Sequence, residues 1–161
     1  MRRALLAVLV LLLLGAVGAP SDVPQLTGRV NDYAGILSVG ARREIEDSLA
    51  RYESETTHQI AVLTVTSLRD EPIEAFSLRV ASTWGLGRKG LDNGVLVTIA
   101  SNERRVRIEL GNGMARFVSE AQASSVIDSM TPLFRSGNFD GALRLGLGRL
   151  MGACRAYRVD K

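Results

Sequence analysis

One stretch of this chain, residues 85–113 (GLGRKGLDNGVLVTIASNERRVRIELGNG), constrains the fold more than any other part of the sequence. Between two glycine-rich reversals it holds a continuous apolar run at residues 95–100 and an alternating run at residues 105–110. The short connection between these runs is suited to a tight turn, so we expect an antiparallel hairpin. Asp92 and Asn93 then lie at the rim of a rigid sheet, where carboxylate and amide oxygens can hold a cation or a polar ligand.

The amino-terminal residues have the three parts of a secretory leader. Two arginines precede an unbroken apolar run at residues 4–14, and small residues follow it. This pattern predicts a signal peptide at residues 1–19 and an exported, periplasmic or extracellular protein. Cleavage after Ala19 and cleavage after Ser21 both stay open. An uncleaved leader that tethers the protein to the membrane is the alternative.

The exported part of the chain is close to neutral. Loss of the two leader arginines lowers the formal net charge from +3 to +1. Proteins that bind nucleic acids or anionic membranes need a clustered basic face, so we expect no nucleic-acid partner and contact with a membrane only through an uncleaved leader. The single cysteine, Cys154, lies in an apolar helical pattern and is predicted to be a core residue rather than a reactive thiol.

Alternating helix and strand patterns predict an α/β fold. The β-branched run at residues 59–66 is typical of a strand covered on both faces. A helix at residues 72–84 connects it to the strand at residues 95–100, which makes a βαβ unit with a right-handed crossover. Because the strand at residues 105–110 then pairs antiparallel, the sheet is mixed. Three other helices are expected, at residues 38–56, 119–130 and 140–154, with a bend or restart at Pro132.

The predicted organisation places one domain at residues 30–154. Two prolines keep residues 20–29 extended, and we interpret these residues as a linker. Residues 30–38 (VNDYAGILS) are an ordered lead-in to the first helix, with Ser38 as its N-cap. Residues 155–161 are left as a C-terminal tail.

Five segments, in the same order along the chain, resemble the TPM domain family. The family includes thylakoid-lumen proteins of photosystem II repair and many exported bacterial proteins. The resemblance covers residues 30–151 and implies a three-layer α/β/α sandwich around the mixed sheet. It also implies divalent-metal binding at loop carboxylates and the acid phosphatase activity of some plant members. The segments are VNDYAGIL, QIAVLTV, TWGLGRKGLDNGVLVTI, ERRVRIELGNG and FRSGNFDGAL.

The acidic positions of the family fall on identifiable residues of this chain. Asp32 matches the carboxylate of the lead-in, and Asp92 with Asn93 matches the DNG turn, so the resemblance implies a Ca²⁺ or Mg²⁺ site at these three side chains. No organic cofactor is expected. The chain departs from the family at Ala115, where a glutamate is usual, which implies weaker cation binding unless Asn112 supplies an oxygen. Two structural alternatives stay open: in one, Asp32 only hydrogen-bonds backbone amides, and in the other, the DNG segment only forms a turn.

The usual phosphatase nucleophiles are missing from the sequence. The sixth residue after Cys154 is Asp160 rather than an arginine, so the cysteine-phosphatase loop is absent. His58, the one histidine, precedes a strand without a partner signature and is expected at the surface. The chemistry that remains is metal-assisted phosphomonoester hydrolysis, in which a cation held by Asp32 and Asp92 activates a water molecule.

The missing nucleophile, the near-neutral charge and the lone thiol favour a non-enzymatic module over an enzyme. We expect an exported domain that binds an envelope or membrane-complex protein and assists its assembly or maintenance, with a weak divalent-cation site. A metal-assisted phosphatase is the alternative. Both hypotheses require Asp32 and Asp92 to meet in one polar recess at the lip of the sheet.

Overall fold

The structure is a computed structural model that describes residues 22–156 of the chain. The predicted signal peptide at residues 1–19 lies outside the described residues, as do residues 157–161 of the predicted tail. The first two residues assigned to that tail continue the last helix.

Within residues 22–156, four strands form one mixed sheet: β1 (Val30–Asp32), β2 (Gln59–Val65), β3 (Gly94–Ala100) and β4 (Arg105–Leu110). The strands lie in the order β1-β2-β3-β4, with β1, β2 and β3 parallel to one another and β4 antiparallel to β3. The predicted mixed sheet, its βαβ unit and its antiparallel hairpin are therefore confirmed. The sequence predicts only an ordered lead-in where β1 forms.

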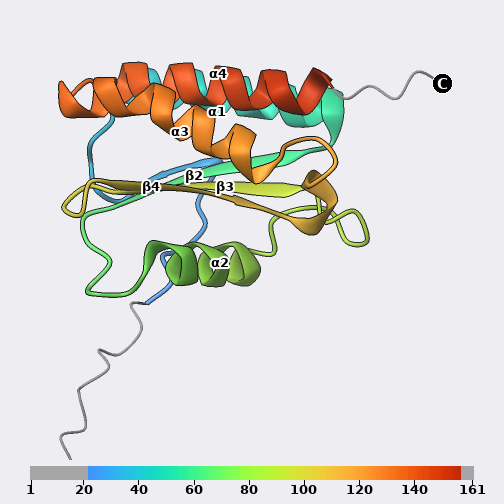
Figure 1. The fold of residues 1–161 in the computed structure, drawn as a ribbon, viewed down its shortest axis with the longest axis horizontal. Coiled ribbons are helices and arrows are strands. Elements are labelled where there is room, and N and C mark those ends of the chain that lie inside the picture. The colour runs from blue at the N-terminus through green and yellow to red at the C-terminus, as the bar shows by residue number, and fades with distance from the viewer. Residues whose placement is uncertain (1–21, 157–161) are drawn as a thin grey trace, which may run out of the picture.

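Four helices of the described chain cover the sheet: α1 (Val39–Thr56), α2 (Ile73–Trp84), α3 (Glu120–Arg135) and α4 (Phe139–Ala156). Three of them, α1, α3 and α4, pack on one face, whereas α2 lies on the other (Figure 1). This arrangement confirms the three-layer α/β/α sandwich.

Local sequence signals define several helix ends. Ser38 caps α1, and its hydroxyl accepts a hydrogen bond from the Ala41 N–H at 3.1 Å. Ser119 and Gln122 form the capping box of α3. The expected restart at Pro132 is wrong, because α3 continues through it to Arg135. Pro132 lies within a turn of the helix end, so its missing N–H interrupts the ladder only where the ladder is about to finish.

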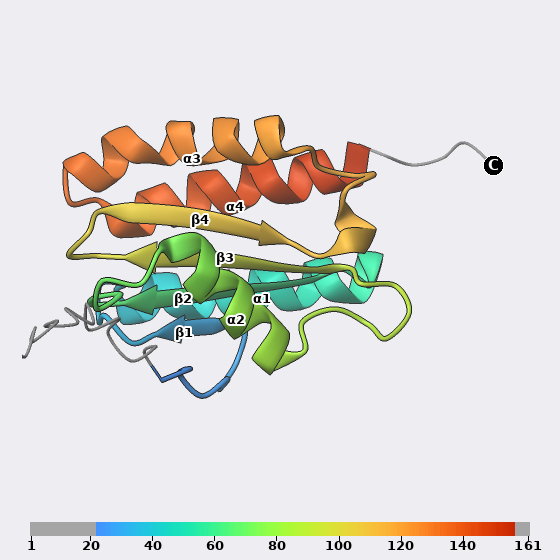
Figure 2. The ribbon, with the colours of Figure 1, turned by 60° about the horizontal axis from the view of Figure 1, so that its bottom comes forward.

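The two parallel crossovers have opposite hands. The strands β1, β2 and β3 follow one another in the same direction across the sheet, yet the connecting helices α1 and α2 lie on opposite faces. In Figure 2, α2 lies in front of the sheet, and the connection from β2 to β3 is right-handed, as the sequence predicts. The connection from β1 through α1 to β2 is consequently left-handed, which is rare among such units.

Two apolar cores flank the central strands. The larger core lies between the sheet and α1, α3 and α4, and the smaller one lies between the sheet and α2. β3 is buried along its whole length, and β2 along all of it except Gln59. Cys154 is buried in the larger core, which confirms its predicted role, and burial raises the pKa of its thiol.

Residues 22–29 form an extended strap, without helix or strand, that is docked on the domain. Val23 packs against the smaller core, and the Trp84 indole N–H donates a hydrogen bond to the Pro24 carbonyl at 2.8 Å. The extended course agrees with the sequence. The interpretation of residues 20–29 as a linker needs correction for the described part, because these contacts make the strap part of the folded domain.

The docked strap predicts a measurable role for residues 22–25. A chain that begins at Leu26 should unfold with a free energy about 1–3 kcal/mol lower than a chain that begins at Asp22, because it lacks the Val23 contact and the Trp84 hydrogen bond. Trp84 is the only tryptophan, so its fluorescence reports on both quantities. The emission of the folded shorter chain should lie to the red of that of the longer chain, and its change during urea unfolding gives the free energy of unfolding of each. Identical emission and identical stability of the two chains would contradict the docking.

Candidate functional site

The structure does not bring the predicted cation ligands together. Asp32 is the last residue of β1, whereas Asp92 lies just before the first residue of β3. Because these strands are parallel, the last residue of β1 and the first residue of β3 lie at opposite ends of the sheet along the strand direction. Asp32 is level with Thr64 of β2 and Gly94 is level with Gln59, so about 16 Å of strand separates the two levels. The predicted recess shared by Asp32 and Asp92 is therefore wrong.

The carboxylate of Asp32 serves the backbone around it. Its Oδ1 accepts hydrogen bonds from the Thr64 hydroxyl at 2.5 Å and from the Ile36 N–H at 3.2 Å, and its Oδ2 accepts one from the Leu37 N–H at 3.0 Å. These bonds hold the turn that leads from β1 into α1, where the left-handed crossover begins. The structural alternative for Asp32 fits this geometry, since both carboxylate oxygens already accept hydrogen bonds from internal donors.

Asn93 is a second structural link rather than a ligand. Its side chain is 4% exposed; the amide nitrogen donates to the Thr57 carbonyl at 2.9 Å, and the amide oxygen accepts from the Arg88 N–H at 2.8 Å. Asn93 thereby fastens the loop before β3 to the end of α1. Within residues 22–156, no three His, Cys, Asp or Glu side chains are grouped to hold a metal ion. The residues present do not fit the Ca²⁺ or Mg²⁺ site that the resemblance implies.

Glycines join two loops at the amino-terminal edge of the parallel strands. The loop at residues 85–93 meets the turn at residues 111–113, and the Gly113 N–H donates to the Asp92 carbonyl at 3.0 Å. A Cβ atom on Gly113 would lie 1.8 Å from the Leu91 carbonyl oxygen. The contact between the loop at residues 85–93 and the turn at residues 111–113, which we call the glycine junction, leaves no room for a side chain at Gly113. It explains why glycines punctuate this part of the sequence.

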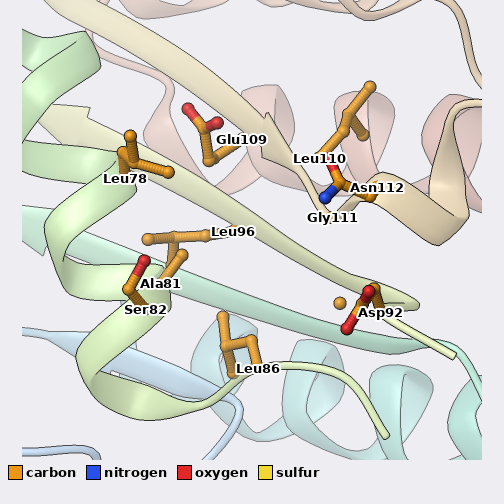
Figure 3. Close-up of a pocket in the computed structure, with 11 residues that line it drawn as sticks. Leu78, Ala81, Ser82, Leu86, Asp92, Leu96, Glu109, Leu110, Gly111 and Asn112 are labelled. Atoms are coloured by element: carbon orange, nitrogen blue, oxygen red, sulfur yellow. The ribbon is translucent and has the colours of Figure 1, made fainter. Parts of the chain in front are cut away.

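Asp92 lies at the centre of the glycine junction in an uncommon conformation. Its φ of 47° is in the left-handed region, which aspartate tolerates better than most residues. The backbone carbonyl is used by the junction, while the exposed side chain points into a groove (Figure 3). That carboxylate makes no hydrogen bond or ion pair with any other residue in the described range 22–156.

A groove of about 290 Å³ opens beside the glycine junction, on the α2 side of the sheet (Figure 3). One wall is α2, with Leu78 and Ala81, and the opposite wall is the end of β4, where the side chain of Glu109 lies on the α2 face. The side chain of Leu110 packs on the other face, against the larger core. The buried side chain of Leu96, from β3, lies between the two walls, and Asp92 stands at one end. We call this feature the α2 groove.

The α2 groove combines apolar and acidic groups. Leu78 is 56% exposed, which is unusual for a large apolar side chain on a helix that covers a sheet. Glu109 adds a second carboxylate at the rim, and one of its oxygens accepts a hydrogen bond from the Arg107 Nε at 3.1 Å. A volume near 290 Å³ is at the low end of the roughly 300–1,000 Å³ of small-molecule sites. The groove therefore suits one or two side chains of a bound peptide better than an extended small molecule.

Sequence reasoning finds only part of this groove. The glycine pattern places Asp92 at the rim of the sheet, and the alternation of residues 105–110 places Glu109 on one strand face with Arg107, but Leu78 attracts no attention in the sequence. A signal for Leu78 does exist: it is a large apolar residue off the helical stripe of Phe76 and Val80, which face the core. An apolar residue outside the core-facing stripe of a helix is a candidate contact for a partner.

His58 is buried, contrary to the sequence-based expectation. It is 8% exposed; its Nδ1 lies 3.1 Å from the Tyr52 hydroxyl, and its ring packs edge-on against Phe117 with 4.5 Å between centroids. Burial, followed by the positive charge of Arg116, lowers the pKa of the imidazole. The residue follows the left-handed cap of α1 and begins the return into β2, so its side chain is directed into the core and supports the packing there.

The α/β/α sandwich and its mixed sheet define the class of fold, and comparison with known proteins defines the family. The family model of the TPM domain matches residues 30–153. The chain belongs to the TPM domain family. No curated protein matches it.

Solved structures from three bacteria resemble this chain. The N-terminal domain of a protein from P. gingivalis is 34% identical, with a TM-score of 0.74 over 79% of this chain and 82% of that chain. A protein from the psychrophilic bacterium Bizionia argentinensis shares the fold at 22% identity, with a TM-score of 0.66 over 78% of this chain and 86% of that one. The N-terminal domain of a Corynebacterium glutamicum protein does so at 14% identity, with a TM-score of 0.64 over 88% and 90%.

The glycine junction predicts that Gly113→Ala destabilises the protein. The added methyl group would meet the Leu91 carbonyl, so we expect the free energy of unfolding to fall by about 1–3 kcal/mol. Gly148→Ala is the matched control, because it is exposed on α4 and its Cβ would meet no atom within 4 Å. It should stabilise the helix by up to about 1 kcal/mol. Urea unfolding gives both values, and equal effects would contradict the junction.

Proposed function

We propose that this TPM-domain protein is exported and binds a protein partner of the cell envelope through the α2 groove. Its role is in assembly or maintenance of the partner's complex, without catalysis of its own. The observation that carries the proposal is the α2 groove itself, with the exposed Leu78 on its wall, the buried Leu96 beneath and Asp92 at its end.

Size and chemistry favour a protein segment as the occupant. The groove is open and shallow enough for side chains that project from a neighbouring chain, and its apolar surface would be covered by binding. The near-neutral charge of the mature chain, +1 after loss of the leader arginines, argues against nucleic acid as a partner.

The alternative of a metal-assisted phosphatase finds no support in the positions of its proposed ligands. It needs Asp32 and Asp92 to hold one cation, but the two residues stand at opposite ends of the sheet. Asp32 also gives both of its oxygens to internal donors. The same geometry argues against a structural cation shared by these two residues.

Export is part of the proposal and is supported by the leader pattern at residues 1–19. Both candidate cleavage positions, after Ala19 and after Ser21, precede Val23. Either cut therefore releases a domain with its strap contacts complete. Within residues 22–156, none of the helices has the length and apolar character to cross a membrane.

Export predicts a mature protein that lacks 19 or 21 residues. We expect the full chain, expressed in a bacterium and fractionated, to give a periplasmic or secreted form whose intact mass begins at Pro20 or Asp22. Replacement of Leu11 and Leu12 by arginine breaks the apolar run and should retain the uncut chain in the cytoplasm. Uncut wild-type chain in the cytoplasm would refute export, and uncut chain in the membrane fraction would identify the leader as a tether.

Partner binding predicts that the α2 groove contacts another protein in the envelope. A photo-crosslinking amino acid at Leu78 should yield a discrete higher-mass product in cells of the source organism after irradiation. The same amino acid at Arg149, which is exposed on α4 on the other side of the sandwich, is the matched control and should not. Equal products from both positions, or no product from Leu78, would contradict a partner at the groove.

A further inference from the structure

We propose that the partner segment held by the α2 groove is a short peptide stretch in which an apolar side chain lies next to a lysine or arginine. This inference rests on the proposed function and names the chemistry of the partner. Two independent features of the groove carry it: an apolar surface that is open to solvent, and a carboxylate at its end that has no counter-charge.

The apolar half of the recognition comes from leucines of three parts of the chain. Leu78 of α2, Leu86 of the loop after α2 and Leu96 of β3 line the groove (Figure 3). Leu96 is already buried, whereas more than half of Leu78 is exposed. A leucine-sized side chain placed between the walls would cover Leu78 and remove apolar surface from water, which supplies most of the affinity.

The charged half of the recognition comes from Asp92. Its carboxylate stands in the groove without a hydrogen bond or ion pair to any other residue in the described part of the chain. Glu109, the other carboxylate of the groove, already accepts a hydrogen bond from Arg107. A cation on the partner therefore finds its counter-charge at Asp92. Because an exposed ion pair contributes about 0–1 kcal/mol, this contact selects among partners more than it binds them.

The position of Asp92 relative to the apolar surface is fixed by the backbone. The glycine junction holds the Asp92 carbonyl, and Asn93 fastens the next residue to the end of α1. On the other side of the groove, Gly111 follows the end of β4, where a Cβ would lie 2.2 Å from the Asp92 carbonyl oxygen. Since these contacts fix Asp92 beside the strand that carries Leu96, the spacing between the apolar and basic side chains of the partner is restricted.

A phage-displayed library of random heptapeptides tests this inference on the mature chain. We expect selection to enrich peptides that pair an apolar residue with a lysine or arginine at a constant spacing, and these peptides should not enrich on Leu78→Glu. A synthetic copy of an enriched peptide, labelled with a fluorophore, then gives the dissociation constant by fluorescence polarisation.

Charge variants isolate the contribution of Asp92. The peptide should bind Asp92→Asn about fivefold more weakly and Asp92→Lys about tenfold more weakly than the wild type. Asn retains the tolerance for a left-handed backbone, so it removes the charge with little strain. Asp128→Lys makes the same charge change on the exposed side of α3 and should alter the affinity by less than about twofold. Urea unfolding checks that each variant is folded.

The possible outcomes separate this inference from the proposed function. Enrichment of purely apolar peptides that depend on Leu78 but not on Asp92 would overturn the inference and leave the groove as a binding site. Failure to enrich any peptide that depends on Leu78 would overturn both. If the affinity falls equally with Asp92→Lys and Asp128→Lys, the net charge of the protein and not the position of Asp92 determines the effect, and the inference is overturned.

Discussion

The close contact of two backbones at the glycine junction is the constraint on which the candidate site depends. Neither the loop at residues 85–93 nor the turn at residues 111–113 could approach the other with side chains between them, since a Cβ on Gly113 would overlap the Leu91 carbonyl. The contact fixes the start of β3 against the end of β4. It uses the backbone of Asp92 and leaves the carboxylate free to face the groove.

The sandwich is unequally covered, and this asymmetry creates the groove. Three helices share one face of the sheet, and α2 alone lies on the other (Figure 1). A single helix of 12 residues cannot cover the whole face. β4 beside it stays partly exposed, and so does Leu78 on the edge of α2. The proposed binding surface therefore follows from the unequal cover of the two faces of the sheet.

Asp32 illustrates how a carboxylate with the sequence context of a metal ligand can serve the fold. Its three hydrogen bonds reach Thr64 on the neighbouring strand and two amides of the turn that follows. That turn directs the chain to the face opposite α2 and begins a left-handed crossover, which ordinary strand twist disfavours. A half-buried network of this kind stabilises the connection that follows the short strand β1.

Local chemistry in the sequence determined much of the fold, because caps, periodicity and turn residues act over a few positions. The capping box at Ser119, the alternation of β4 and the apolar spacing that buries Cys154 each specify their own segment. Only the tertiary structure decided which strand ends lie at the same end of the sheet. β1 has three residues and no period to reveal its direction, so the separation of Asp32 from Asp92 follows from pairing with β2. The exposure of Leu78 and the burial of His58 are likewise set by neighbours distant in the chain, which no local pattern records.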